Sequence, residues 1–353
     1  MTTPPPAKRP RTDDPDALES SSSGQESARS NNYERGEVWL DDGNVVLVAE
    51  RTAFKVLKSI LSLHSEVFRD MFTIPQPADA EMWEGCAVVH LQDSKKDLLY
   101  VLRALFDTRN AAWFAYGSKL PFTIVSAMLR LGSKYQIAQL RDDAIRRLSE
   151  SFPPRLNQFL NCYTVGMPSE DVEIQNNAVQ FELADVCIAV INLSRTCDTP
   201  QFLPPAFYLS AVIDNENLLS GWTDRDGNHW QLSPQDLLRC LNGRGALQNV
   251  VVKQQRPLLT GTASTRCTSV RACEEALEDR RDDLYDEDLD DISHQAKALT
   301  DISCSWISDV TLCAFCEKEF KKQYNALRSE TWDELADSFD LDGVEWPVKE
   351  PTS

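Results

Sequence analysis

The sequence predicts an α+β domain, a small sheet with helical hairpins, followed by a mainly α-helical carboxy-terminal domain. Two observations support this fold class. Within residues 42–72 a short apolar strand leads into two amphipathic helical turns, and beyond Pro154 apolar residues recur mostly at helical spacing. We therefore divide the chain into a tail at residues 1–32, a first domain at 36–152 and a second domain at 155–345.

The first strand is predicted over Val45–Val48, with a charged turn at Glu50–Thr52. After the turn, apolar residues recur three and four positions apart, which places them on one face of a helix. They are Phe54, Leu57, Ile60, Leu61, Val67, Phe68, Met71 and Phe72. This stretch offers apolar shape and little reactive chemistry, which indicates a protein that holds a partner.

The rest of the first domain contains one more strand and three helices. The strand is predicted at Ala87–Leu91, and Asp93–Ser94 can cap the helix that follows it. Pro121 begins the next helix. The last helix, Gln139–Ser149, ends before Pro153–Pro154 because proline cannot continue a helix.

The second domain is predicted to be mainly helical. Its helical segments are Asn177–Leu193, Pro205–Val212, Gln235–Leu241 and Ala296–Asp340. Asp224–Gly227 has the composition of a tight turn, and Trp222 and Trp230 flank it, which predicts a small hairpin with a helical arrangement as the alternative. Residues 274–291 hold eleven acidic residues against two arginines, and we interpret them as an acidic loop or a solvated helix face.

Charge and composition limit the classes of function and the cell compartment of the protein. The net charge of −19 disfavours a nucleic-acid surface, which needs clustered Lys and Arg. No apolar run approaches the length of a membrane span, and the amino terminus lacks the apolar core of a secretory signal. We expect a protein of the nucleus, the cytoplasm or both, with reduced cysteines.

The tail at residues 1–32 is rich in Pro, Ser and Asp, and we predict that it is disordered because it has little apolar surface to bury. Lys8, Arg9 and Arg11 form a compact basic cluster between prolines, which resembles a nuclear import signal. The alternative is incidental charge in a polar tail.

The run from Phe54 to Phe72 resembles the signature of the BTB (POZ) domain, F-x-[VA]-H-[KR]-x-x-L-x-x-x-S-x-x-F-x-x-[ML]-[FL]. The matching residues are Phe54, Val56, Lys58, Leu61, Ser65, Phe68, Met71 and Phe72. The resemblance implies a β-hairpin, a helical hairpin, a further strand and paired helices, and a homodimer formed through this domain. Leu57 stands where the family usually has His, so the polar group that this His would serve needs another partner.

More narrowly, the chain resembles a large, mostly uncharacterised set of fungal BTB-domain proteins, chiefly of mushroom-forming species. Phrases such as HSEVFRDMF and LRLGSKYQI are typical of that set. So is a carboxy-terminal LCxxC, here Leu312–Cys316, followed by a W-x-x-L motif at Trp332 and Leu335.

Cys313 and Cys316 form a C-x-x-C pair, with Cys304 and His294 upstream. Zinc needs four ligands, usually from two such pairs, and the spacing of Cys267 and Cys273 is not that of a ligand knuckle. We therefore predict buried structural cysteines and no cofactor, with zinc at Cys313 and Cys316 as the weaker alternative.

Other metal and catalytic patterns fail. Asp286, Asp288 and Asp290 imitate the opening of a calcium loop, but Asp291 stands where that loop needs glycine. The four histidines, His64, His90, His229 and His294, form no catalytic motif with neighbouring residues. We predict that the protein is not an enzyme.

The leading hypothesis is a protein–protein interaction scaffold in which a BTB domain mediates homo- or hetero-oligomerisation. Resemblance to BTB adaptors implies recruitment of a cullin ubiquitin ligase, with the second domain selecting a substrate. The alternative is a nuclear regulatory protein that assembles a transcription-related complex without binding DNA. A pure self-recognition module and a zinc-bearing domain are the remaining alternatives.

Overall fold

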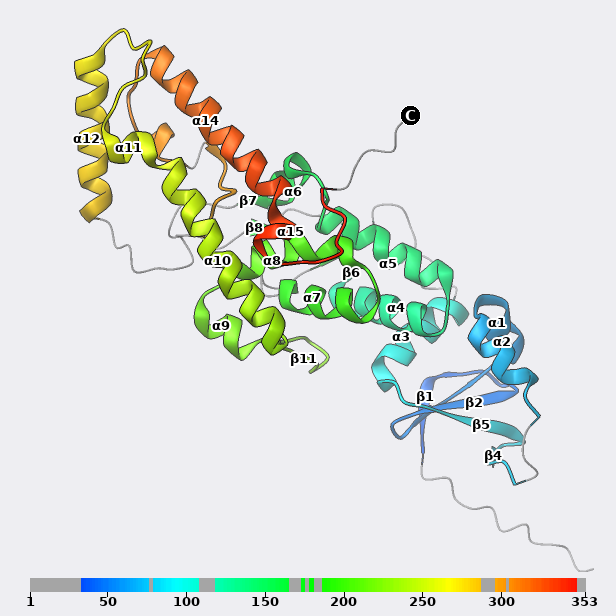
Figure 1. Cartoon of the computed structure of the whole chain (residues 1–353). Helices are drawn as coiled ribbons and strands as arrows, with labels where there is room; N and C mark the ends of the chain where they lie inside the picture. The colour runs from blue at the N-terminus through cyan, green and yellow to red at the C-terminus, as the bar shows by residue number, and fades with distance from the viewer. Residues whose placement is uncertain are drawn as a thin grey trace, which may run out of the picture. The chain divides into compact units, whose positions relative to one another are not determined.

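The computed structural model describes residues 33–75, 79–107, 118–164, 173–174, 178–180, 186–286, 296–302 and 305–347 (Figure 1). The predicted fold class is confirmed. A small sheet with helical hairpins comes first in the chain, and a mainly helical region follows it. Among the helices of these ranges, none is both long enough and apolar enough to cross a membrane.

A five-stranded mixed sheet opens the fold, in the order β1-β3-β2-β5-β4. Its strands are β1 (Glu34–Trp39), β2 (Val45–Ala49), β3 (Thr52–Val56), β4 (Met82–Trp83) and β5 (Cys86–Leu91). The central strand β2 runs antiparallel to β3 and parallel to β5, and all of its residues are buried. Burial on both faces explains why β2 is an unbroken apolar run.

The helical hairpin begins later than the sequence predicted. Phe54 lies on β3, where it pairs with Leu47 of β2, so its assignment to a helical turn was wrong. Glu50, with φ of 53°, forms the tight turn that joins the two strands. A short apolar run is compatible with a strand or a helix, and here the pairing with β2 decides between them.

Five helices lie among the described residues of the first part of the chain. They are α1 (Lys58–His64), α2 (Glu66–Thr73), α3 (Lys95–Phe106), α4 (Phe122–Lys134) and α5 (Ala138–Ser151). The predicted cap at Ser94 is confirmed, because its hydroxyl accepts a hydrogen bond from the Lys96 amide at 3.2 Å. α5 ends at Ser151, before Pro153–Pro154 and two residues beyond the predicted end at Ser149.

The rest of the chain is mainly helical. Its helices are α6 (Leu156–Cys162), α7 (Val186–Thr196), η2 (Pro200–Phe202), α8 (Leu203–Ala211), α9 (Asn215–Ser220), α10 (Pro234–Gln254), α11 (Arg256–Thr260), α12 (Val270–Asp286), η4 (Trp306–Ser308), α14 (Ala314–Asp333) and α15 (Leu335–Ser338). Short strand pairs join β6 (Leu120–Pro121) to β9 (Val179–Gln180), β7 (Tyr163–Thr164) to β8 (Glu173–Ile174), and β10 (Trp222–Thr223) to β11 (His229–Trp230). The predicted hairpin between Trp222 and Trp230 is therefore confirmed.

Two helix predictions need correction at their ends. The predicted helix Asn177–Leu193 is wrong over Val179–Gln180, because these residues form β9, which pairs with β6. Gln235–Leu241 is only the beginning of α10, which continues through Gly243 to Gln254. A Cβ atom at Gly243 would lie 2.1 Å from Cδ1 of Phe339, so glycine here permits close packing and does not end the helix.

Two predictions for the carboxy-terminal region are also revised by the structure. The acidic stretch is helical as far as Asp286, which favours the solvated helix face over the acidic loop, and its remainder lies outside the described residues. Ile307 belongs to the short η4, and Leu312 precedes α14, so continuous helical periodicity from Ala296 was wrong.

One large core extends through the sheet, the helices beside it and most of the helical region. It includes residues on both sides of Pro153–Pro154, and the domain boundary placed there stays a prediction. A second, separate core of eight buried residues lies among α11, α12, η4 and α14. Its members are Leu258, Cys273, Leu277, Trp306, Ile307, Cys316, Phe320 and Tyr324.

Candidate functional site

Ser65 joins the helical hairpin α1–α2 to the helices behind it. Its hydroxyl caps α2 by accepting a hydrogen bond from the Phe68 amide at 3.0 Å, and it donates one to the Tyr135 carbonyl at 2.5 Å. Ser65 is buried, so both hydrogen bonds are made away from water. Phe68 stacks on the Tyr135 ring with centroids 4.6 Å apart, which strengthens the same junction.

The other signature residues are mostly core residues. Those buried in the large core are Phe54, Val56, Leu61 and Phe68, while Met71 and Phe72 are partly buried and pack against it. These side chains therefore hold the hairpin against the sheet and the neighbouring helices. The signature reports how the domain is packed and does not by itself mark a binding surface.

Replacing Ser65 by alanine should lower the free energy of unfolding by about 2 kcal/mol. Loss of a helix cap costs about 1 kcal/mol, and a buried carbonyl that loses a donor costs about 1–3 kcal/mol. Urea unfolding followed by circular dichroism measures the difference. The exposed residue Thr73, whose hydroxyl donates to the Asp70 carbonyl, provides the control, and Thr73→Ala should cost less than about 0.5 kcal/mol.

At the start of α1, Leu57 replaces the family's usual histidine, and another residue makes the polar contact. Leu57 occupies the N-cap position without making a side-chain cap. Instead, Oδ1 of Asn44, from the turn before β2, accepts a hydrogen bond from the Lys58 amide at 2.8 Å. One free amide of the first turn is thus satisfied from a neighbouring segment.

Two large apolar side chains on this hairpin are exposed to solvent. Leu63, near the end of α1, is 74% exposed, and Ile74, directly after α2, is 63% exposed. Exposed charged residues of α2, Glu66 and Arg69, lie between them in the sequence. Apolar residues bordered by charged ones are the usual composition of a protein-binding surface.

Helices α3 and α4 of this domain contact the β10–β11 hairpin. Lys96 and Tyr100 of α3 both hydrogen-bond to the Asp226 carboxylate, at 3.1 and 2.9 Å. Arg130 of α4 lies over the Trp230 ring, 5.0 Å from its centroid, and forms an ion pair with Asp97. Burial raises the pKa of Asp97 although Arg130 opposes this, and burial followed by the Asp226 hydrogen bond raises the pKa of Tyr100 to about 12.

Asp224 and Asp226, in the predicted tight turn, have structural partners. The Asp224 carboxylate accepts hydrogen bonds from the Asp226 and Asn228 amides, both at 2.9 Å, and from the Trp230 indole at 3.1 Å. Asp224 therefore stabilises the turn, and Asp226 connects the turn to α3 through hydrogen bonds.

A cluster of four cysteines is the second candidate site. The Sγ atoms of Cys267, Cys273, Cys313 and Cys316 all lie within 4.8 Å of one another. Cys267 precedes α12, Cys273 lies in its first turn, Cys313 is the N-cap of α14 and Cys316 lies in its first turn. Every cysteine that the structure describes is a free thiol.

The cysteine cluster is surrounded by backbone donors. Amide-to-sulfur hydrogen bonds run from Ser269 to Cys267 at 3.4 Å, from Cys313 to Cys273 at 3.3 Å and from Ser264 to Cys316 at 3.3 Å. Backbone hydrogen bonds from Cys316 and then Thr268 lower the pKa of Cys313 to about 5. Burial raises the pKa of Cys273 and of Cys316.

The spacing of Cys267 and Cys273 does not predict a ligand knuckle, and from the sequence alone only Cys313 and Cys316 are zinc candidates. The fold brings all four together, because each pair lies at the start of a helix and these two helix starts meet. The available signal was the clustering of cysteines along the chain, because five of them, Cys304 included, lie within residues 267–316.

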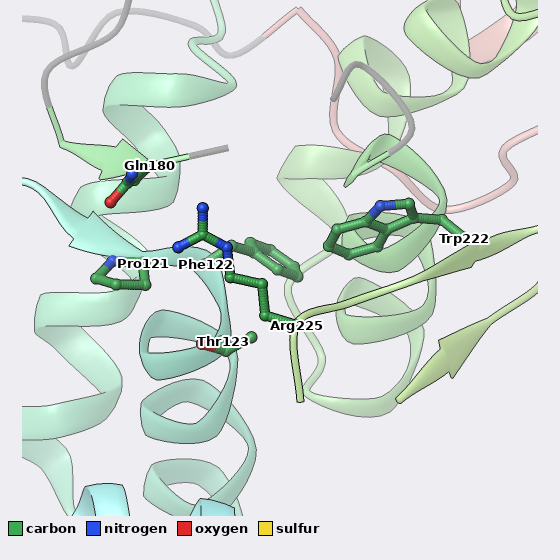
Figure 2. Close-up of a pocket in the computed structure, with 6 residues that line it drawn as sticks. All are labelled: Pro121, Phe122, Thr123, Gln180, Trp222 and Arg225. Carbon is green, nitrogen blue, oxygen red and sulfur yellow. The ribbon is translucent and has the colours of Figure 1, made fainter. Parts of the chain in front are cut away.

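Two surface hollows lie among the residues that the structure describes. Figure 2 shows the Arg225 side chain reaching from the β10–β11 turn beside Phe122, with Trp222 on the far side of that ring. This hollow has a volume of about 20 Å³, room for about one water molecule. A second hollow, near α15, is bordered by acidic side chains that include Asp333, Asp337 and Asp340.

The described histidines lie on separate elements. His64 belongs to α1, His90 pairs with Glu81 at 2.7 Å, and His229 pairs with the Thr223 hydroxyl at 3.0 Å. The contacts of His90 and His229 are both exposed to solvent. Several other predicted positions lie outside the described residues: Lys8, Arg9, Arg11, His294 and Cys304.

Residues 41–151 match the family model of the BTB/POZ domain. The match covers the sheet from β2 onward, the α1–α2 hairpin and the helices through α5, so the chain contains a BTB/POZ domain. Such domains are generally protein-interaction modules. No curated protein matches the chain closely enough to indicate common ancestry. Membership of a fungal subfamily stays a prediction.

Proposed function

We propose that this protein is a non-enzymatic interaction scaffold in which the BTB/POZ domain pairs two copies of the chain through the α1–α2 hairpin. The observation that supports the pairing is the exposure of Leu63 and Ile74 on that hairpin. Removing two such side chains from water on each copy favours association, at roughly 25 cal/mol per Å² of apolar surface.

The α1–α2 hairpin is a better candidate for the pairing surface than the α3–α4 side of the domain. On that side, Lys96, Tyr100 and Arg130 already contact the β10–β11 hairpin. A two-fold axis near α1–α2 places the same apolar side chains on both copies, as an isologous dimer requires.

Replacing Leu63 and Ile74 together by aspartate should abolish pairing. Two buried carboxylates without partners on each copy cost far more than the 1.4 kcal/mol that weakens binding about tenfold. Two differently tagged copies of the full chain are co-expressed, one tag is captured, and the other tag is quantified.

The matched control changes Leu238 and Leu241 to aspartate. Both are exposed leucines, and they lie on α10, outside the BTB/POZ domain. The control should recover as much of the second tag as the unmodified chain. Equal recovery with the Leu63 and Ile74 variant would contradict the proposed surface.

We propose, more specifically, that the scaffold is an adaptor for a cullin ubiquitin ligase and that its helical region selects the substrate. Its support is the BTB/POZ domain joined to a second, mainly helical region. Affinity capture of the tagged full chain, probed for cullins, tests it. Capture without any cullin, under conditions that recover a known BTB adaptor with its cullin, removes this proposal.

The alternative is a nuclear regulatory scaffold, favoured by the basic cluster Lys8, Arg9 and Arg11. Changing all three to alanine should shift a fluorescent fusion from the nucleus to the cytoplasm. An unchanged distribution removes the import signal and leaves the adaptor as the better proposal.

A further inference from the structure

Cys267, Cys273, Cys313 and Cys316 form a compact set of sulfur atoms that the BTB/POZ domain does not contain and the interaction function does not use. We propose that these four thiolates bind one zinc ion, which fastens the start of α12 to the start of α14. The site is structural, because four protein ligands leave no open position for a substrate or water.

The sulfur geometry fits a single tetrahedral ion. A Zn–S bond of about 2.3 Å places the sulfurs of a tetrahedral site roughly 3.8 Å apart. Here, Cys267 and Cys313 have Sγ atoms 3.6 Å apart, and every pair in the cluster is within 4.8 Å. Side-chain movements of about 1 Å or less therefore bring all four sulfurs to bonding distance.

The chain supplies the ligands as two pairs from two helix starts. Cys313 and Cys316 are separated by three positions across the N-cap and first turn of α14, so both thiols face the same side. Cys267 and Cys273 bracket the beginning of α12. The first pair has the spacing of a zinc knuckle, and the second reaches the same point because the turn at Ser264–Cys267 folds back.

Hydrogen-bond donors and helix amino termini around the cluster favour thiolates. A zinc ion with four thiolates carries a net charge of about −2, which amide hydrogen bonds to sulfur and helix amino termini stabilise. The amides of Ser264, Ser269 and Cys313 each donate to one of the sulfurs. The cluster also lies at the amino-terminal ends of α12 and α14.

The packing around the cluster explains what the metal adds. The core of α11, α12, η4 and α14 is separate from the large core, and two of its eight buried residues are Cys273 and Cys316. A core of this size is marginal without a covalent or metal cross-link. Zinc would join segments forty residues apart, Cys273 to Cys313, beside this small core.

Thiolate-only, four-coordinate sites suit zinc or iron. Two disulfides are the other outcome that four neighbouring cysteines allow, although 3.6 Å between Cys267 and Cys313 is much longer than the roughly 2.05 Å of a disulfide. The experiment therefore distinguishes zinc, iron and disulfides.

The full chain is purified without chelator, and its zinc and iron are measured by inductively coupled plasma mass spectrometry. We expect about one zinc per chain. Cys267→Ser and Cys313→Ser should each lose most of that zinc. The control is Cys162→Ser, which changes a cysteine of similar, partial burial outside the cluster and should keep the full amount. Less than a tenth of an equivalent in the unmodified chain, or one equivalent of iron instead, overturns the proposal.

A second measurement uses the unmodified chain, so it does not depend on whether a variant folds. Iodoacetamide labelling is mapped by peptide mass spectrometry before and after chelation. We expect Cys267 and Cys313 to be protected until chelator is added, while Cys162 is labelled equally in both samples. Equal labelling of Cys267 with and without chelator, or a disulfide-linked peptide from this cluster, contradicts the zinc site.

Discussion

Replacing Arg147 by alanine should lower the free energy of unfolding by about 3–5 kcal/mol. The side chain is 1% exposed, and its Nε forms an ion pair with Asp143 at 2.7 Å. Its Nη1 and Nη2 donate to the carbonyl and hydroxyl of Ser118, at 2.5 and 3.1 Å, and Nη1 also reaches the Ala178 carbonyl at 3.3 Å. Alanine removes a buried charge from a network that joins α5 to the segments preceding β6 and β9.

Chemical unfolding in urea, followed by circular dichroism, measures this loss. The control is the adjacent residue Arg146, whose side chain is 47% exposed and pairs with Asp143 and Glu150. Surface ion pairs contribute about 0–1 kcal/mol, so Arg146→Ala should change stability by less than about 1 kcal/mol. If Arg147→Ala were as mild as Arg146→Ala, the buried network would not support the fold as described.

Replacing Phe159 by alanine should cost about 3–5 kcal/mol, the usual cost of deleting a buried aromatic ring. Phe159 has no exposed surface, and its ring centroid lies 4.8 Å from Tyr163 and 5.0 Å from Trp332. The ring therefore connects α6 with α14. Alanine leaves a cavity between them.

Thermal and urea unfolding of Phe159→Ala are compared with those of Phe315→Ala. Phe315 is an exposed phenylalanine on α14, and Arg266 lies over its ring in a cation–π contact of 5.1 Å. Such contacts are worth about 0.5–1 kcal/mol at exposed sites, so this control should lose no more than that. Equal losses for the two variants would contradict the central position of Phe159.

The BTB/POZ domain was largely predictable from sequence because its signature residues are packing residues. Leu61, Ser65 and Phe68 each have one structural requirement, burial or capping, and that requirement fixes the residue type. The carboxy-terminal W-x-x-L motif has the same character, because Trp332 and Leu335 are both buried in the large core.

The missed features depend on contacts between distant segments. Phe54 lies on a strand because it pairs with β2. Gly243 lies inside α10, where the absence of a side chain leaves room for the ring of Phe339. Arg147 resembles its exposed neighbours in sequence, and only the Ser118 and Ala178 carbonyls reveal that it is buried. No local periodicity carries that information.

The cysteine cluster is the clearest example at the candidate site. Local spacing identifies Cys313 and Cys316 as a pair, but it places no constraint on Cys267 and Cys273, which reach the pair only after α12 and α14 are brought together. Spacing rules for metal sites assume that each ligand pair comes from one short turn. Here the second pair spans a loop and a helix start.

The central claim is that the BTB/POZ domain pairs two copies of this chain. Size-exclusion chromatography with multi-angle light scattering, applied to the full chain over micromolar concentrations, tests it most directly. We predict the mass of a dimer, about twice the 39.8 kDa of one chain, and the mass of one chain for the Leu63→Asp, Ile74→Asp variant. A single-chain mass for the unmodified protein at every concentration would contradict the account.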